Sequence, residues 1–191
     1  MAKKKLDLLL INPGDRVEIY QILGSSGLSA AEPPIWTGLL ASYMLVKGYS
    51  VEIIDANAEC LIPGQVAQRV QDANPLLTAV VVYGHNPSAS TQVMPSAGRI
   101  CAAIKELTPQ QPLLLVGGHI AALPEKTLRE EAADFVCTGE GPVTLWDLVE
   151  CLKTKPHDYQ KVRGLMYLQD GMLIKNSPAP NVTNLDEEMP G

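Results

Sequence analysis

The sequence predicts an α/β fold built on a doubly wound parallel sheet of five strands. Three observations support this prediction: short apolar runs recur along the chain, each run is continuous rather than alternating, and a segment of helical period follows each one. Continuous runs of this length are typical of strands covered by helices on both faces. With 191 residues, the chain is long enough for one such domain to bury a substantial core.

The predicted strands are rich in leucine, isoleucine and valine, and they cover residues 6–12, 50–56, 76–83, 112–118 and 133–139. The predicted helices follow them in turn and cover residues 34–48, 64–73, 92–107, 124–132 and 142–153. In the first helix, apolar residues from Leu39 to Val46 recur at helical spacing, and Gly48 follows as a C-terminal cap.

Regular alternation of strand and helix predicts right-handed crossovers and the strand order 2-1-3-4-5 of flavodoxin-like folds. In such sheets, ligands bind at the carboxyl ends of the strands, at the switch point between the first and third strands. The residues that directly follow the strands are therefore the candidates for a binding site.

Beyond Lys153 the pattern changes. Two short runs flank Asp170 and Gly171, which is a strong signal for a two-residue hairpin, and a proline-rich segment follows. We therefore assign residues 1–154 to the ligand-binding domain and residues 155–191 to a β-hairpin and an extended linker.

Charge and cysteine usage narrow the functional classes. A net charge of −6 leaves no basic face for nucleic acid. Three lysines precede the first apolar run, but Asp7 interrupts that run before it reaches signal-peptide length, so we expect a cytoplasmic protein without membrane contact. The four cysteines are far apart and form no pattern typical of a zinc ribbon or an iron–sulfur loop. We expect buried free thiols and no metal ligands.

The strand ends are rich in glycines, histidines and hydroxyls. A connection of about twenty residues follows the first strand, where two to six are usual, and long loops at such positions are often functional. No G-x-G-x-x-G opens a helix there, and no P-loop motif occurs. Our candidates for ligand contact are Asn12, Pro13, Gly14, Tyr83, Gly84, His85, Pro87, Ser88, Ser90, Thr91, Gly117, Gly118, His119, Gly139, Glu140 and Gly141. We assign no catalytic residue.

Several of these residues have a structural interpretation as well. The hydroxyls of Ser88, Ser90 and Thr91 could cap a helix that begins near Gln92. Both His85 and His119 could be turn histidines.

The acidic and aromatic residues also have alternatives. Glu140 could be a favourable charge near the N-terminus of a helix. Asp55 could form a turn at the end of the second strand or bond a hydroxyl of a ligand. Trp36 and Tyr43 are predicted to be core residues of the first helix rather than stacking partners of a ligand, and Trp146 is predicted to be a core residue.

An ordered series of motifs carries a resemblance to a known family. The series consists of G-G-H at 117–119, P-E at 124–125, A-D-F-V at 133–136 and G-E-G at 139–141, followed by a hairpin and an N-L-D-E linker. Together these motifs resemble the N-terminal cobalamin-binding region of B12-dependent radical SAM enzymes, which has a Rossmann-type B12-binding fold. The resemblance covers nearly the whole chain.

This resemblance implies that the strand ends hold base-off cobalamin, with its nucleotide tail beside the first, third and fourth strands. Ser88 and Ser90 would bond the tail, while Gly117 and Gly118 would leave room for it. S-adenosylmethionine and a [4Fe-4S] cluster are expected only in a C-terminal radical SAM domain of the same polypeptide, which is absent from this sequence. This chain alone would bind the cofactor without catalysing a reaction.

One departure concerns the lower ligand of cobalt. Many related B12 domains carry D-x-H-x-x-G after the first strand, whereas residues 12–24 here contain no histidine. The departure suits members that transfer a methyl group from S-adenosylmethionine to a substrate radical. A module of a non-methylating enzyme that performs oxidation or ring formation is an alternative. Two further alternatives are a flavodoxin-like domain that binds a nucleotide or flavin and a regulatory domain that binds no ligand.

Overall fold

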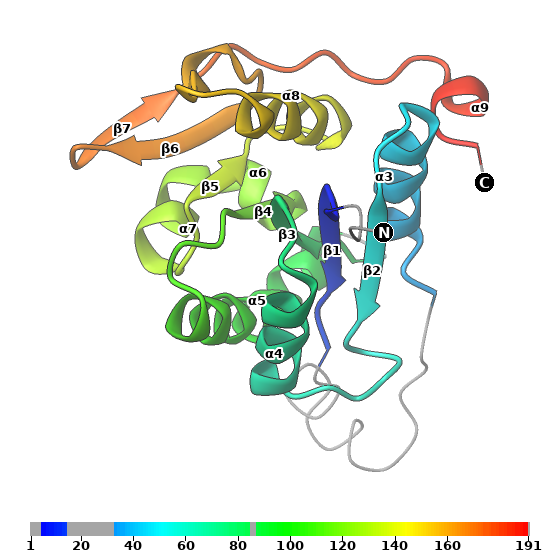
Figure 1. The fold of residues 1–191 in the computed structure, drawn as a ribbon, viewed down its shortest axis with the longest axis vertical. Helices are drawn as coiled ribbons and strands as arrows, with labels where there is room; N and C mark the ends of the chain where they lie inside the picture. The colour runs from blue at the N-terminus through cyan, green and yellow to red at the C-terminus, as the bar shows by residue number, and fades with distance from the viewer. Residues whose placement is uncertain (1–4, 15–32, 85–86, 191) are drawn as a thin grey trace.

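The fold is known from a computed structural model, which describes residues 5–14, 33–84 and 87–190. His85 and most of the predicted long connection after the first strand lie outside the described residues. The described chain forms three layers, in which helices cover both faces of one sheet (Figure 1).

The sheet has seven strands in the order β2-β1-β3-β4-β5-β6-β7. These strands are β1 (Leu8–Asn12), β2 (Val51–Asp55), β3 (Leu77–Val82), β4 (Leu113–Gly117), β5 (Phe135–Cys137), β6 (Leu165–Gln169) and β7 (Met172–Lys175). The first five strands pair in parallel, and β6 and β7 pair antiparallel. The predicted order 2-1-3-4-5 is confirmed, and the predicted hairpin extends the same sheet.

The helices are α3 (Ile35–Val46), α4 (Pro63–Ala73), α5 (Pro87–Leu107), α6 (Gly118–Ala122), α7 (Pro124–Glu130), α8 (Pro142–Lys153) and α9 (Leu185–Glu188), together with the 3₁₀ turn η1 (Tyr159–Lys161). One apolar core joins α3 and α8 to the first face of the sheet, and a second core joins α4, α5, α6 and α7 to the other face. Successive residues of β1 show the alternation, because Leu8 and Leu10 belong to the first core and Leu9 and Ile11 to the second.

Two helices differ from the prediction at the edge that matters for ligands. Helix α5 begins at Pro87 rather than near Gln92, because proline fits the first position of a helix, where its missing N–H costs nothing. Ser90 and Thr91 therefore lie inside the helix, and their predicted role as N-caps is wrong. Helix α6 starts directly after β4, and its five residues are too few to show a helical period.

The C-terminal segment folds back on the domain. At the hairpin turn, Asp170 and Gly171 have φ angles of 52° and 77°, as a two-residue turn of this kind requires. The chain then runs past α8 to α3 (Figure 1). There Met189 is buried in the first core, and the Ser42 hydroxyl donates to the Pro190 carbonyl at 2.5 Å. The assignment of residues 155–191 to a connector toward another domain stays a prediction.

Among the described residues, no helix combines the length and the apolar character that crossing a bilayer requires.

A partly buried network of hydrogen bonds and one ion pair fixes the amino-terminal edge of the sheet. The Asp7 carboxylate accepts hydrogen bonds from the backbone N–H and the hydroxyl of Ser50, both at 2.8 Å, and lies 3.4 Å from the Lys153 ammonium. Burial acts to raise the pKa of Asp7, but these hydrogen bonds and the lysine outweigh it and hold the pKa below its usual value. The ionised carboxylate therefore contributes to stability.

We predict that Asp7→Ala lowers the free energy of unfolding by about 1.5 kcal/mol at pH 7. Because the pKa is depressed in the folded state, this contribution is complete above the unfolded pKa near 4 and is lost as the pH falls through the folded value. Urea unfolding at pH 7 and pH 3 should show the difference between parent and variant shrinking in acid. The exposed Glu106→Ala is the control, and an equal loss at both pH values would contradict the prediction.

Candidate functional site

The carboxyl ends of β1, β3, β4 and β5 meet at one edge of the sheet, because these strands are parallel and in register. This edge brings together most of the predicted residues: Asn12, Pro13, Gly14, Tyr83, Gly84, Ser90, Thr91, Gly117, Gly118, His119, Gly139, Glu140 and Gly141. Pro87 and Ser88 lie in the first turn of α5, although the described structure does not include their side chains. His85 lies outside the described residues.

Ser90 joins three of the elements at this edge. Its side chain is only 1% exposed, and its hydroxyl donates to the Val82 carbonyl at 2.5 Å. The same oxygen accepts the backbone N–H of His119 at 2.9 Å. Ser90 therefore uses its proton within the protein and ties α5 to the end of β3 and the start of α6.

The side chains of Thr91 and His119 contact each other at the surface of the same edge. The Thr91 hydroxyl lies 3.0 Å from Nδ1 of His119, which fixes the orientation of the half-buried imidazole. Because α5 and α6 present these two groups side by side, the edge offers a hydroxyl and an imidazole to a polar ligand.

Three of the predicted glycines are required by close backbone packing. A Cβ atom at Gly14 would overlap the backbone of Ala56, one at Gly84 would overlap Ala89, and one at Gly117 would overlap the Val82 carbonyl. Gly117 also has a φ of +155°, which side chains rarely allow. The sequence alone suggested room for a ligand at Gly117, but the space there is filled by β3.

Two other glycines lie beside open space. A Cβ atom at Gly118 would meet only the side chain of Ser90, at the ordinary contact distances of 3.6 and 3.7 Å. A Cβ atom at Gly139 would meet nothing within 4 Å. Backbone without side chains therefore borders the edge at the ends of both β4 and β5, where a ligand can approach it closely.

The ends of β1 and β2 are fixed by hydrogen bonds. The Asn12 amide donates to Asp55 Oδ1 at 2.9 Å, and the same oxygen accepts the backbone N–H of Ala58 at 3.0 Å. Asp55 is therefore a turn former, one of the two roles considered for it. The Ser96 hydroxyl of α5 donates to the Gly14 carbonyl, which attaches the end of β1 to the helix.

An aromatic pair borders the opposite side of the edge. The rings of Trp36 and Tyr83 stack with centroids 4.8 Å apart, and the Tyr83 hydroxyl donates to the Glu140 carbonyl at 2.9 Å. Burial raises the pKa of Tyr83, so the hydroxyl stays protonated and remains a donor.

Trp36 is 49% exposed, so the prediction that it belongs to the core is wrong. It lies in the first turn of α3, at the end of the helix that reaches this edge. One feature of the sequence could have indicated this exposure. Trp36 lies in the first turn of the predicted helix, beside the ligand edge, and residues 35–46 include no charged residue to cover the edge.

The Glu140 side chain is exposed, and its backbone carbonyl accepts the hydrogen bond from Tyr83 two residues before the start of α8. The next residue, Gly141, has a φ of +108°, and a Cβ atom there would lie 2.8 Å from the Val116 side chain. Glycine is therefore needed where the chain turns from β5 into α8.

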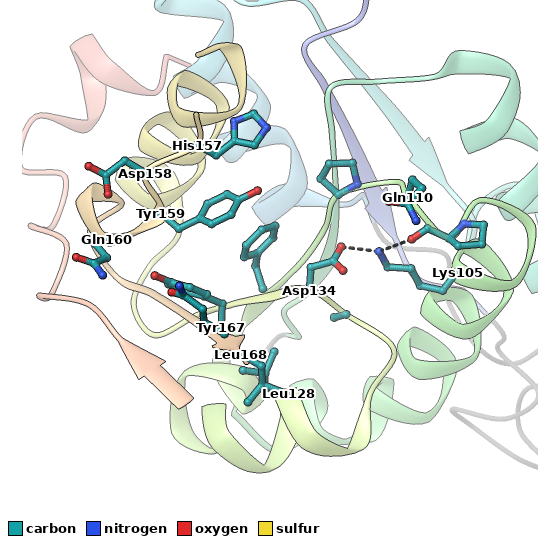
Figure 2. Close-up of a pocket in the computed structure, with 15 residues that line it drawn as sticks. Lys105, Gln110, Leu128, Asp134, His157, Asp158, Tyr159, Gln160, Tyr167 and Leu168 are labelled. Atoms are coloured by element: carbon teal, nitrogen blue, oxygen red, sulfur yellow. Dashed lines mark hydrogen bonds and ion pairs between the residues drawn. The ribbon is translucent and has the colours of Figure 1, made fainter. Parts of the chain in front are cut away.

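A separate cavity of about 680 Å³ lies at the amino-terminal edge, far from the predicted residues. Figure 2 shows Tyr159 and Tyr167 on one side of it and the pair of Lys105 and Asp134 on the other. Lys105 contacts Asp134 at 2.5 Å and donates to the Gln111 carbonyl at 2.7 Å. These charges therefore hold the loop after α5 to the start of β5.

The four cysteines are all free. Cys101 and Cys137 are buried, as predicted, and burial raises the pKa of both thiols. The prediction of burial is wrong for Cys60, which is exposed, and Cys151 is partly buried. Within the described ranges, no group of three or more His, Cys, Asp or Glu side chains is arranged to hold a metal ion.

Comparison with known proteins identifies relatives of this architecture. Residues 28–149 match the family model of the B12 binding domain. A protein of Pyrococcus horikoshii described as an uncharacterized methyltransferase is 29% identical over 185 residues. The match covers 96% of this chain and 37% of that relative.

Two solved structures share the fold. The radical S-adenosylmethionine methyltransferase TsrM of Kitasatospora setae, solved with cobalamin and a [4Fe-4S] cluster, superposes with a TM-score of 0.70 at 17% identity, over 95% of this chain and 30% of that one. The cobalamin-dependent S-adenosylmethionine radical enzyme OxsB, solved with aqua-cobalamin and S-adenosylmethionine, gives 0.69 at 21% identity, over 95% and 23%. This chain therefore spans less than two fifths of each relative.

We predict that Ser90→Ala lowers the free energy of unfolding by about 2 kcal/mol, because it leaves the buried Val82 carbonyl and the His119 N–H without a partner. The exposed Thr91→Ala should change it by less than about 0.5 kcal/mol. Urea unfolding of both variants would measure the difference. Equal stability of Ser90→Ala and the parent would show that Ser90 does not join these elements.

Proposed function

Because the chain belongs to the B12 binding domain family, we propose that it holds cobalamin in base-off form over the carboxyl ends of β1, β3, β4 and β5. In this proposal the chain is the cofactor module of a radical SAM enzyme. The observation that carries the proposal is the open backbone at Gly118 and Gly139, on adjacent strand ends of a fold that binds ligands at this edge.

The residues at the edge fit the two chemically different parts of such a cofactor. Gly118 allows the nucleotide tail to approach the backbone, and Thr91 and His119 can bond its polar groups. Gly14, Gly84 and Gly117 support the proposal indirectly, because they let the strand ends pack without side chains between them. The protein thus positions the cofactor and sets its chemical environment.

The finer proposal concerns methyl transfer. Cobalamin, when bound, supplies a cobalt centre that can carry a methyl group between S-adenosylmethionine and a substrate. The described residues at the edge include one imidazole, that of His119, whose Nδ1 contacts Thr91. His157 lies at the amino-terminal edge, with Nδ1 3.1 Å from the Cys151 carbonyl. We propose that neither ring is a ligand of cobalt.

The proposed partner is a radical SAM domain that carries the [4Fe-4S] cluster and S-adenosylmethionine. The support is that this chain covers 37% of the relative described as a methyltransferase and 30% of TsrM. The partner domain would generate the substrate radical, and this chain would hold the methyl carrier beside it.

Retention of the cofactor tests the proposed function directly. We expect the isolated chain, after incubation with hydroxocobalamin, to retain the corrinoid on a desalting column and to show the visible spectrum of the base-off form. A parallel incubation with flavin mononucleotide is the matched competitor. Retention of the flavin with no corrinoid would refute the proposal in favour of a flavodoxin-like function.

A substitution at Gly118 tests where the tail lies. Gly118→Val adds bulk above the edge without touching backbone, so we predict a folded variant whose cobalamin affinity falls by about tenfold to a hundredfold. Ala122→Val places the same side chain at the exposed far end of α6 and should leave the affinity unchanged. An unchanged dissociation constant for folded Gly118→Val, measured by absorbance titration, would mean that the tail runs elsewhere.

A further inference from the structure

The side chains at the candidate site differ on the two sides of the sheet edge. On the side of α5 and α6 they are polar, with Thr91 and His119 in contact at the surface and Ser90 buried beneath them. On the side of α3 and α8 they are the stacked rings of Trp36 and Tyr83. A ligand that spans the edge therefore meets polar groups on one side and an aromatic wall on the other.

The aromatic wall is held rigidly. The Tyr83 hydroxyl is bonded to the Glu140 carbonyl at 2.9 Å, which fixes this ring between β3 and the start of α8. Trp36 stacks on Tyr83 with an angle of 24° between the rings. Because one face of the indole is fixed in this way, little conformational entropy is lost when a ligand contacts the rest of it.

The surface that the wall presents is apolar. Trp36 is 49% exposed, its neighbour Ile35 is 62% exposed, and α3 contains no charged residue. Exposed tryptophan next to exposed isoleucine, at an edge where ligands bind, fits the apolar part of a ligand better than a phosphate or a sugar.

We propose that Trp36, held by Tyr83, packs against the corrin macrocycle and sets its position over the strand ends. This inference rests on the proposed binding of cobalamin. The nucleotide tail of the cofactor is charged and hydroxylated, and the polar side of the edge suits it. The macrocycle is broad and largely apolar, and the aromatic wall suits it. Indole has no lone pair to offer to a metal, so Trp36 positions the macrocycle without coordinating cobalt.

The sequence contains two tryptophans, and the second one is a built-in control. Trp146 lies in α8 and donates from Nε1 to the Tyr49 hydroxyl at 3.0 Å, and Tyr49 lies two residues before the start of β2. The Lys47 ammonium, after the end of α3, lies 4.5 Å from the centroid of the Trp146 ring. Trp146 thus faces the amino-terminal edge, and Trp36 lies at the carboxyl edge.

Fluorescence quenching in single-tryptophan variants tests the placement. Corrins absorb where tryptophan emits, and energy transfer falls steeply with distance. We expect added cobalamin to quench Trp146→Phe, which retains Trp36, much more strongly than Trp36→Phe, which retains Trp146. Equal quenching of the two variants at saturation, or stronger quenching of Trp146, would overturn the inference.

Affinity provides a second measurement. Trp36→Ala should bind cobalamin about tenfold more weakly, and Trp36→Phe should recover part of the loss because it keeps an aromatic face. The control is Leu45→Ala, because Leu45 is 54% exposed at the other end of the same helix. Folding of each variant is checked by circular dichroism, and if Trp36→Ala fails to fold, the quenching comparison decides.

The two proposals fail in different ways. If the parent chain retains no corrinoid, the proposed function is wrong. If the parent binds cobalamin but Trp36→Ala binds it equally tightly and Trp36 is not preferentially quenched, the proposed function stands and the role of Trp36 is wrong.

Discussion

The central constraint on this structure is the burial of its middle strands on both faces. Every residue of β3 and β4 is buried, so helices must cover both sides, and each connection must cross from one end of the sheet to the other. All carboxyl ends of the parallel strands therefore meet at one edge. Ala56 and Tyr83 still pack against the two cores there, while the polar and glycine residues at that edge are tolerated without loss of packing.

Close backbone contact at this edge depends on glycine. Gly14, Gly84 and Gly117 each stand where a side chain would collide with a neighbouring strand, turn or helix, and the strand ends therefore pack tightly. Ser90 strengthens this packing, because one hydroxyl satisfies a strand carbonyl and a helix N–H together. The edge is thus a rigid support, and Gly118 leaves the open space next to it. A preorganised site of this kind binds a large cofactor without paying much ordering entropy.

The C-terminal segment packs back on the domain that carries the candidate site. The hairpin of β6 and β7 extends the sheet beyond β5, and the chain then crosses α8 to reach α3 (Figure 1). Met189 joins the first core, so this segment is packed rather than free. Helix α3 contacts the C-terminal segment through the Ser42 hydroxyl, which donates to the Pro190 carbonyl, and it carries Trp36 at the end that reaches the site.

The sequence by itself determined the strand order, most of the crossover helices and the edge where the carboxyl ends of the parallel strands meet, because continuous apolar runs and helical periods follow from burial on two faces. It also determined the hairpin at Asp170, because turn residues encode local backbone angles. Only the tertiary structure decided the roles of single residues. Gly117 packs against β3, whereas the space beside Gly118 is open. Trp36 stacks on Tyr83 at the surface instead of packing in the core. These differences depend on neighbours far away in the chain, and no local pattern records them.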